Sequence, residues 1–261
     1  MNPKIVSGRL LVFSSIVLAA LFPANRIFAD EIRVDVVVDV TAEGKKAIRP
    51  TPDKPAFYLP LPAGYTERGR VLVHYQRPPP SAPEVQRLVT EALAKQNYQP
   101  ATKQSPPSLV LVYWWGYIAP EFVGPQKSKK IGRGGEFVNE VEMLSMVGGE
   151  TVDTKNTYDP QIQEIIAASR HPRYYLLVSA FDYQAWLHHN SVLLWRAHVS
   201  CPVWHHYLDQ VLPTLINTGA PLFGQETTAP VLITTPNVGR VMLGEPVVKA
   251  IPEAPPPAGQ P

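Results

Sequence analysis

The sequence predicts an α+β fold, in which amphipathic helices pack on one face of a mostly antiparallel sheet and one loop and helix segment is inserted. Three observations predict it. Several stretches rich in Val and aromatic residues show the alternation that is typical of β-strands. Other stretches place apolar residues at helical spacing. The order of these elements includes a hairpin within 173–200, which argues against a doubly wound parallel sheet.

Residues 1–29 have the layout of a cleaved export signal. Lys4 and Arg9 precede an apolar run at 10–22, and the small residue Ala29 follows at the expected cleavage point. The run is shorter than the ~20 residues that a membrane span needs. We therefore expect an exported chain, periplasmic or extracellular, that has no membrane span after cleavage. A retained signal that anchors the chain is the alternative.

Charge and cysteine content exclude two classes of protein. Of the 24 Lys and Arg residues, three lie in 1–29, a segment that holds none of the 22 Asp and Glu residues. The rest of the chain is therefore close to neutral, and nothing favours a nucleic-acid partner. A single cysteine, Cys201, cannot form an internal disulfide, so the fold is not a disulfide scaffold. We expect Cys201 to be a small buried hydrophobic residue.

A single α+β domain is predicted at 30–244, and it begins with a Val-rich strand at 31–40. Prolines then crowd the stretch 50–62, which we expect to be extended loop with one short edge strand at 56–59. A second strand is predicted at 70–76, where apolar and polar residues alternate again.

The best-marked helix follows Ser81. Ser81 and Glu84 have the spacing of a capping box, and the helical pattern ends near Asn97. The next strand, at 108–118, is apolar on both faces and is therefore predicted to be central in the sheet. The apolar residues expected on one face of the helix are Val85, Leu88, Val89, Ala92 and Leu93.

The segment 119–158 interrupts this pattern. It contains a basic, glycine-rich stretch at 126–136 and a short helical pattern at 136–147. We interpret the whole segment as an insertion that lies next to the sheet. The glycines do not have the spacing of a phosphate-binding loop.

A further helix is predicted at 158–170, with Asp159 as its N-cap and Pro160 at the first helical position. Two strands then follow at 173–187 and 192–200, and a short turn that contains two histidines joins them. These two strands form the predicted hairpin.

The C-terminal part holds a helix at 204–219, which Pro213 is expected to kink. A short strand is predicted at 231–234. Residues 245–261 are rich in proline, and we expect them to form a disordered tail.

Three stretches carry a resemblance to known proteins: EALAKQNYQP at 91–100, SLVLVYWWGY at 108–117 and LLWRAHVS at 193–200. In series they resemble a group of exported bacterial envelope proteins of unknown function, many of them lipoproteins. The resemblance covers roughly 70–218 without the insertion. This chain departs from the group because it has no lipobox cysteine and has Asn-Tyr in place of Gly-Tyr after the helix. The resemblance implies an envelope location and an α+β fold, but no activity and no functional residues.

The stretch 185–206 holds five of the seven histidines and the only cysteine, which suggests a metal site. Two of these histidines lie at the turn, roughly 25 Å from the far end of the return strand. The remaining candidates are His198, His205 and His206, with Cys201. Strand alternation places His198 and Cys201 on opposite faces. Neighbouring residues on a helix point about 100° apart, so His205 and His206 are poor partners for one ion.

A hydrolytic site in the same hairpin is a further alternative. Nucleophilic catalysis needs Ser or Cys with a base within reach, and the chain contains no G-x-S-x-G motif. Asp182 would orient His198 only if the two were cross-strand neighbours. The competing interpretation is that Asp182 pairs with Arg196 or is solvated. No cofactor is expected.

Aromatic and basic residues offer candidate contact surfaces. An aromatic strand face that the helices leave uncovered would suit a protein or glycan partner, and the basic loop would suit an anionic polymer or headgroup. The competing interpretations are that the insertion covers the aromatic face and that the loop is solvated. The candidate partner-binding residues are Trp114, Trp115, Tyr117, Lys129, Lys130 and Arg133.

Together these observations favour a non-enzymatic, exported envelope protein with a structural or interaction role, whose partner is an envelope protein or a glycan. The alternative is a periplasmic metal-binding protein or hydrolase that uses the histidine-rich hairpin.

Overall fold

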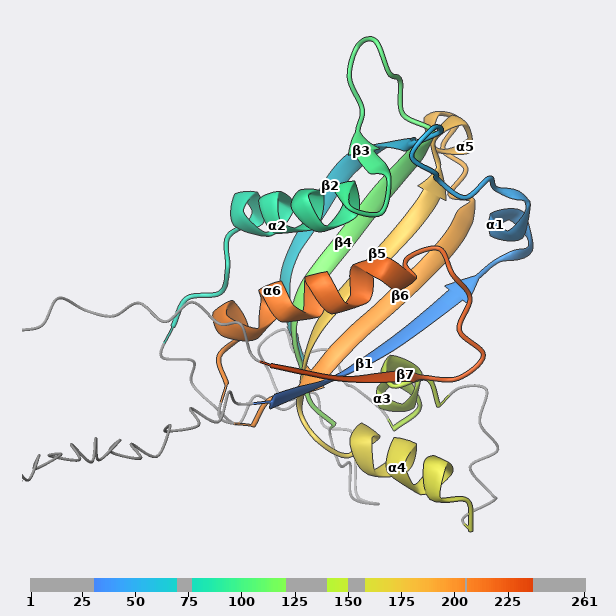
Figure 1. The fold of residues 1–261 in the computed structure, drawn as a ribbon. Helices are drawn as coiled ribbons and strands as arrows, with labels where there is room; N and C mark the ends of the chain where they lie inside the picture. The colour runs from blue at the N-terminus through green and yellow to red at the C-terminus, as the bar shows by residue number, and fades with distance from the viewer. Residues whose placement is uncertain (1–30, 70–76, 121–139, 150–157, 205, 237–261) are drawn as a thin grey trace, which may run out of the picture.

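The computed structural model describes residues 31–69, 77–120, 140–149, 158–204 and 206–236. These residues form one seven-stranded sheet with helices around it (Figure 1), in the strand order β3-β2-β4-β5-β6-β1-β7. Within the described part of the chain, no helix is both long and apolar enough to cross a membrane. The strands are β1 (Glu31–Val40), β2 (Ala56–Arg68), β3 (Tyr98–Pro100), β4 (Leu109–Ile118), β5 (Arg173–Asp182), β6 (Leu193–Pro202) and β7 (Val231–Pro236). The helices are α1 (Ala42–Lys46), α2 (Ala82–Ala94), α3 (Glu140–Met146), α4 (Pro160–Ser169), α5 (Tyr183–Leu187) and α6 (Leu208–Gly219).

The sheet is mixed, which corrects the prediction of a mostly antiparallel one. Strands β4, β5, β6, β1 and β7 pair antiparallel in succession, whereas β2 runs parallel to both β3 and β4. The parallel part follows from the path of the chain. After β2 the chain returns through α2 to the end of the sheet where β2 began, so the next strand must run in the same direction.

Strand β2 is the largest departure from the sequence prediction, because Pro60 and Pro62 lie inside it. In a parallel strand, alternate residues direct their backbone groups to the same neighbour. The carbonyl of Tyr58 accepts from Ala101 N on the β3 side of the strand, and β3 pairs only with residues 56–58. Pro60 and Pro62 follow Tyr58 at a spacing of two, so their nitrogens face the side where β3 has ended. A strand tolerates proline where no neighbour requires its N–H.

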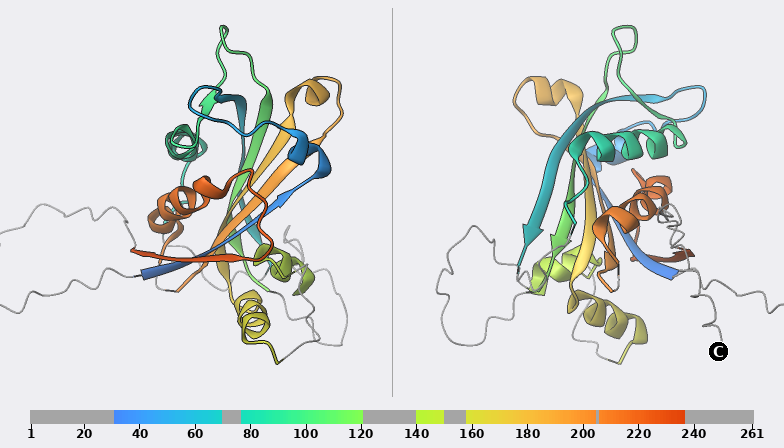
Figure 2. Two further views of the ribbon diagram at one scale, coloured as in Figure 1. Left: turned by 45° about the vertical axis from the view of Figure 1, so that its right-hand side comes forward. Right: turned by 90° about the vertical axis from the view of Figure 1, so that its left-hand side faces the viewer.

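The helices lie on both faces of the sheet, which corrects the prediction that they pack on one. Helices α2 and α6 cover the first face and bury the main core (Figure 2, right). Helix α3 packs on the opposite face, where Met143 and Met146 contact Ile118 and Tyr175. The alternation along the strands explains this, since β4 and β5 are apolar on both sides. The fully buried strand residues of the first face include Val34, Val36, Leu111, Tyr113, Leu176, Val178, Ala197 and Val199.

The predicted hairpin is present, but its first strand ends earlier than expected. The carboxylate of Asp182 accepts from Ala185 N at 2.7 Å and so caps α5, which occupies the end of the stretch predicted as strand. A carboxylate at this position satisfies a free N–H of the first turn. The other end of the hairpin also differs, because α6 begins at Leu208 and leaves Trp204 outside the helix.

Several other predictions are confirmed. The strands at 31–40 and 108–118 form, with the second one central, and β7 covers the predicted 231–234. Asp159 caps α4 by accepting from Gln161 N at 2.8 Å. Helix α2 buries Val85, Val89, Ala92 and Leu93 as predicted, although the Ser81 side chain makes no capping bond. The predicted export signal, the strand at 70–76, the basic loop and the proline-rich tail lie outside the described residues.

Gly116 of β4 permits a close cross-strand contact. A Cβ atom at Gly116 would lie 1.8 Å from the carbonyl oxygen of Thr66, so no other residue fits without a shift of β2. Gly116 pairs with Thr66 on one side and with Tyr175 on the other. The hydroxyls of Tyr175 and Thr66 form a hydrogen bond over the glycine. The backbone of β2 thus occupies the space that a side chain at residue 116 would have filled.

Replacement of Leu176 by alanine tests which leucines hold the fold together. Leu176 is 0% exposed in the main core, so Leu176→Ala is expected to lower the free energy of unfolding by about 2–5 kcal/mol. Leu187 is 53% exposed, and Leu187→Ala is expected to change it by less than ~0.5 kcal/mol. Urea unfolding followed by circular dichroism measures both values. Equal losses would contradict the assignment of the core.

Candidate functional site

A charged pair lies buried inside the sheet. A guanidinium NH2 group of Arg173, at the start of β5, donates to the Asp35 carboxylate of β1. The Nε of Arg173 donates to Ser200 Oγ of β6 at 2.9 Å. The side chains of Arg173 and Asp35 are only 1% and 2% exposed. Three strands therefore meet at one buried polar cluster, which lies on the face of the sheet opposite α2 and α6.

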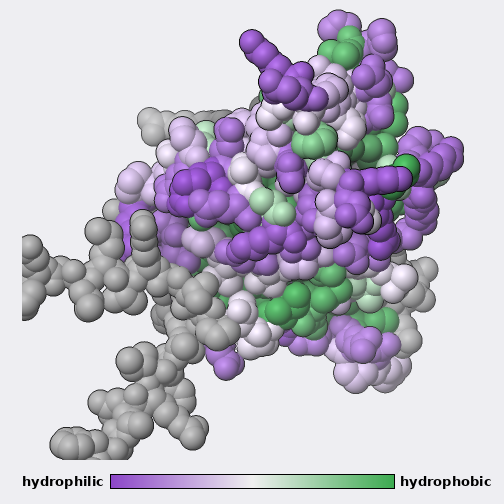
Figure 3. All heavy atoms as spheres, turned by 45° about the horizontal axis from the view of Figure 1, so that its top comes forward, coloured by the Kyte–Doolittle hydropathy of each residue, from purple (hydrophilic) through white to green (hydrophobic). Residues whose placement is uncertain are grey.

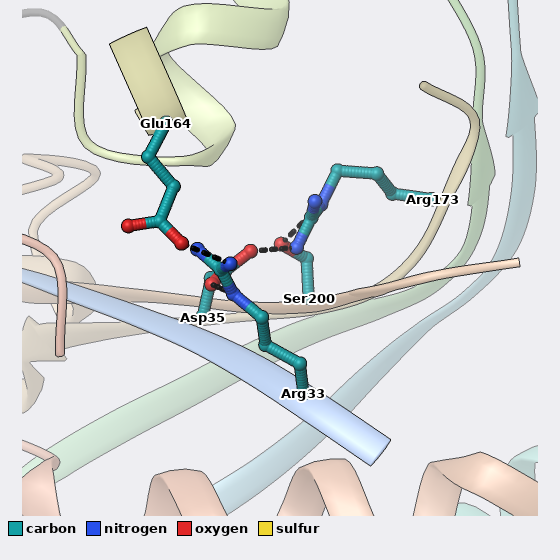
Figure 4. Close-up of polar contacts among 5 residues, drawn as sticks. All are labelled: Arg33, Asp35, Glu164, Arg173 and Ser200. Carbon is teal, nitrogen blue, oxygen red and sulfur yellow. Dashed lines mark hydrogen bonds and ion pairs between the residues drawn. The ribbon is translucent and has the colours of Figure 1, made fainter. Parts of the chain in front are cut away.

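Two further residues extend the cluster to the surface. Arg33 lies two residues before Asp35 on the same face of β1, and its Nε lies 3.4 Å from Asp35 Oδ1. The NH1 group of Arg33 donates to the Glu164 carboxylate of α4. The two arginines converge on Asp35 (Figure 4). Arg33 and Glu164 are 37% and 45% exposed, so the charges alternate in sign from the interior to solvent.

In this cluster the opposite charges of Arg173 and Asp35 offset the cost of burying each of them. Burial lowers the pKa of Arg173, and the Asp35 carboxylate opposes that change by stabilising the charged guanidinium. A charge removed from water costs several kcal/mol unless a partner and hydrogen bonds compensate for it. Asp35 and Ser200 supply both. Removal of Asp35 or Ser200 would therefore leave the buried Arg173 guanidinium without one of its hydrogen-bond acceptors.

A cleft, which we call the β1–α4 cleft, opens next to this cluster. Its volume is about 270 Å³. Its mouth carries Trp204, which is 61% exposed and lies edge-on to His171, with ring centroids 5.7 Å apart. The lining residues combine the charged cluster with apolar walls: Glu31, Ile32, Arg33, Asp35, Glu164, Ala167, Ala168, His171, Arg173, Pro202, Trp204 and His206.

A second cleft, which we call the α1 cleft, lies towards the other end of the strands and has a volume of about 590 Å³. Tyr98 and Trp195 line it from the core side, with ring centroids 6.3 Å apart. Lys46, Arg49 and Lys54 line it from the solvent side. Within the part of the chain that the structure describes, no carboxylate forms an ion pair with any of these three cations. The cations are therefore available to an anion.

The loop that carries two of these cations is held by its own backbone. Thr51 and Lys54 exchange two backbone hydrogen bonds of 3.0 Å each. Pro50, Pro52 and Pro55 fix φ at three positions of the same loop. A preformed loop loses little conformational entropy when a ligand binds.

Hydrophilic residues cover most of the face that Figure 3 brings forward, and hydrophobic residues gather mainly in its lower half.

The structure separates the histidine candidates for a metal site. His198 lies in the middle of β6, opposite Leu177 of β5, whereas His206 lines the β1–α4 cleft. His205 lies outside the described residues. Cys201 belongs to the main core, on the face opposite His198, as the strand alternation predicts. No group of three or more metal-ligating side chains occurs among the residues that the structure describes.

The two residues that the hydrolase interpretation would bring together, Asp182 and His198, are also far apart. Asp182 pairs with Leu109 at the far end of β5, five positions from the residue opposite His198, which corresponds to roughly 16 Å along the strand. The Asp182 carboxylate also caps α5, so it neither orients His198 nor pairs with Arg196. The Nε of Arg196 lies 3.3 Å from Ser179 Oγ instead.

The aromatic partner candidates fall on different faces of β4. Trp115 and Tyr117 are each only 1% exposed in the main core, and Trp115 Nε1 donates to the carbonyl of Pro80 at 3.1 Å. Neither residue reaches the surface. Trp114 is half-buried on the opposite face, next to the cluster around α3. Lys129, Lys130 and Arg133 lie outside the described residues.

Sequence reasoning missed the buried cluster and the three cations of the α1 cleft. Asp35 and Arg173 had a detectable signal, since Asp35 lies between the valines of β1 and Arg173 immediately precedes the apolar run of β5. A charge at such a position indicates a buried partner. Lys46, Arg49 and Lys54 had no such signal, because the proline-rich stretch gave no indication of where its side chains would gather.

These features define an α+β protein whose described residues form the β1–α4 cleft, with a buried ion pair in its lining, and the α1 cleft. No protein-family model and no curated protein matches the chain.

Three solved structures are weakly similar. PelC from Paraburkholderia phytofirmans, a dodecamer, is 12% identical with a TM-score of 0.34, over 74% of this chain and 99% of that one. A PDZ domain protein from Parabacteroides distasonis is 10% identical with a TM-score of 0.38, over 78% and 38%. A DUF4136 family protein from Bacteroides thetaiotaomicron is 11% identical with a TM-score of 0.28, over 71% and 90%. At these scores the likeness assigns no family to the chain.

Removal of Asp35 tests the buried pair. Asp35→Ala leaves the Arg173 guanidinium buried without its counter-ion, so we expect a loss of about 3–5 kcal/mol in the free energy of unfolding. The matched control is Glu91→Ala, which breaks the exposed Arg87–Glu91 pair and is expected to cost less than ~0.5 kcal/mol. Chemical denaturation measures both. A small loss for Asp35→Ala would contradict the role of this pair.

The reactivity of Cys201 is predicted to report global unfolding. Burial raises the pKa of the Cys201 thiol to about 12, above its value in the unfolded chain, so the folded protein holds almost no thiolate at pH 8. A thiol-specific reagent at pH 8 is expected to label the native protein very slowly and the urea-unfolded protein at once. The same shift predicts that stability falls as pH rises above about 9, because the unfolded chain then releases a proton that the folded chain keeps. Rapid native labelling would contradict the buried position.

Proposed function

We propose that this chain is an exported protein of the bacterial cell envelope that works by binding, without catalysis, and that its ligand in the α1 cleft is an acidic glycan. The observation that carries the proposal is the group of three cations, Lys46, Arg49 and Lys54, around a cleft of about 590 Å³. No carboxylate among the described residues neutralises them by an ion pair.

The chemistry of the cleft supports an anionic ligand with rings. Exposed lysine and arginine side chains attract carboxylate or sulfate groups, and several weak contacts add up along a polymer. Tyr98 and Trp195 line the inner wall, where each is 5% exposed and offers a ring edge to a sugar. The turn that Thr51 and Lys54 close with two backbone hydrogen bonds holds Lys54 in place before binding, and Arg49 lies two residues before this turn. Two carboxylates, Glu43 and Asp182, also belong to the lining, so the three cations leave it with one net positive charge.

Export is supported by the amino-acid sequence. The apolar run at 10–22, its basic flank and Ala29 form the layout of a cleaved signal. The resemblance of the strand and helix pattern to exported envelope proteins points to the same location. An exported protein meets acidic polysaccharides at the cell surface, which fits the charge of the cleft.

A triple substitution tests this proposal. Lys46→Ala, Arg49→Ala and Lys54→Ala together are expected to weaken binding of an alginate oligosaccharide, a polyuronate, by about tenfold, because each exposed ion contact contributes about 0.2–1 kcal/mol. Added salt is expected to weaken binding to the unsubstituted protein and to affect the triple variant much less. Isothermal titration calorimetry measures the dissociation constants.

The matched control removes three exposed cations outside the cleft: Lys95, Lys103 and Arg170. Replacing them by alanine makes the same change in net charge and is expected to leave the affinity within about twofold. Equal weakening by both triple variants would show that only net charge matters and would overturn the proposed site. Equal binding of neutral dextran would overturn the choice of an acidic ligand.

A further inference from the structure

We propose that the β1–α4 cleft is a second binding site, that its ligand is a small carboxylic acid with an apolar body, and that Glu164 occupies the carboxylate position when the ligand is absent. This site is separate from the α1 cleft in position and in chemistry. The α1 cleft is open and bordered by exposed cations, whereas the β1–α4 cleft is narrower and has arginines in its lining.

The hydrogen-bond donors of Arg173 point to an acceptor ligand. A guanidinium has five N–H donors. Within the described part of the chain, one donor of Arg173 binds Asp35 and one binds Ser200, which leaves three without a protein acceptor. Donors without an acceptor are costly where water has little access, and the Arg173 side chain is only 1% exposed and lines the cleft. An oxygen of a bound ligand would satisfy them.

Glu164 shows which group the site accepts. Its carboxylate already binds the NH1 group of Arg33 at the edge of the cleft. Arg33 and Arg173 both converge on Asp35, so the two guanidinium groups share a single buried carboxylate (Figure 4). Arg33, Arg173 and Asp35 together therefore carry one positive charge more than negative, which Glu164 balances in this structure, and Glu31 adds a further carboxylate to the lining. A ligand carboxylate can take the place of Glu164, since both oxygens of a carboxylate fit the planar fork of an arginine.

The other walls of the cleft determine the body of the ligand. The apolar part of the lining comes from Ala167 and Ala168 of α4 and from Ile32, Pro202 and Trp204. The small alanine side chains leave a gap that a leucine would fill. A volume of about 270 Å³ lies near the lower end of small-molecule pockets, which begin at ~300 Å³. One aromatic ring or a short aliphatic chain matches this space.

The experiment compares 3-phenylpropionate with its neutral isostere, 3-phenylpropanamide, in binding to the mature chain. Amide chemical shifts in a nitrogen-15 NMR titration measure affinity and locate the site. We expect the acid to shift the signals of Arg33, Glu164 and Arg173, and the amide to bind at least tenfold more weakly. No binding of the acid, or equal binding of acid and amide, would overturn the proposal.

Two variants on the exposed part of the cluster test the roles of its members without removal of the buried pair. Arg33→Gln is expected to weaken binding of the acid at least fivefold. Glu164→Gln is expected to tighten it severalfold and to leave the amide unchanged, because it removes the competing carboxylate. Unchanged or weaker binding of the acid by Glu164→Gln would show that Glu164 only shapes the cleft, and would overturn its assigned role.

The matched control is Glu226→Gln, which removes another exposed carboxylate, one that pairs with Lys45 at 2.8 Å. It is expected to leave binding of the acid at the β1–α4 cleft unchanged. Arg49→Ala is likewise expected to have no effect on the shifts of Arg33 and Arg173. If these two variants abolished the shifts, the acid would be binding in the α1 cleft, and the inference would be overturned.

Discussion

The ion pair between Arg173 and Asp35 is the interaction on which the alignment of the sheet depends. It joins the first residue of β5 to the middle of β1 across β6, so it fixes the alignment of three strands at once. A slip of one residue in any of them would turn a charged side chain towards α2 and α6, into the apolar core. The pair therefore specifies one register in strands whose valines and leucines would pack acceptably in others. The same register sets the walls of the β1–α4 cleft.

Strand β2 and helix α2 add the second constraint. The crossover through α2 makes β2 parallel to β4 and covers one face of β4, and α3 packs on the other face. Since β4 then lies inside the sheet, its aromatic residues become core residues: Trp115 and Tyr117 pack under the helices, and Trp115 finds an acceptor in Pro80. The two clefts that we propose as binding sites lie instead towards the two ends of the strands. Loops meet at these ends, and charged side chains gather there.

The amino-acid sequence predicted those elements whose residues respond to local rules. The alternation in 31–40, the helical spacing after Ser81 and the N-cap at Asp159 are properties of neighbouring residues, and each appears in the structure. Long-range pairing decided the rest. Pro60 and Pro62 suggested loop because their tolerance in a strand depends on where β3 ends. The fraction of the candidate site that was predictable was small, since both clefts combine segments far apart in the chain. Lys54 and Trp195 are distant in the sequence but line the same cleft, and the same is true of Arg33 and Glu164.

The prolines of β2 also bear on how copies of this protein behave at high concentration. Beyond residue 58, β2 has no further partner among the described strands on its β3 side. Unpaired backbone groups of this kind form hydrogen bonds with a strand from another molecule and so serve as a template for aggregation. At Pro60 and Pro62 that template offers no N–H, and an incoming strand would lose two ladder hydrogen bonds in succession. The same residues that obscure the strand in the sequence thus oppose edge-to-edge aggregation in a protein that must fold outside the reach of cytoplasmic chaperones if it is exported.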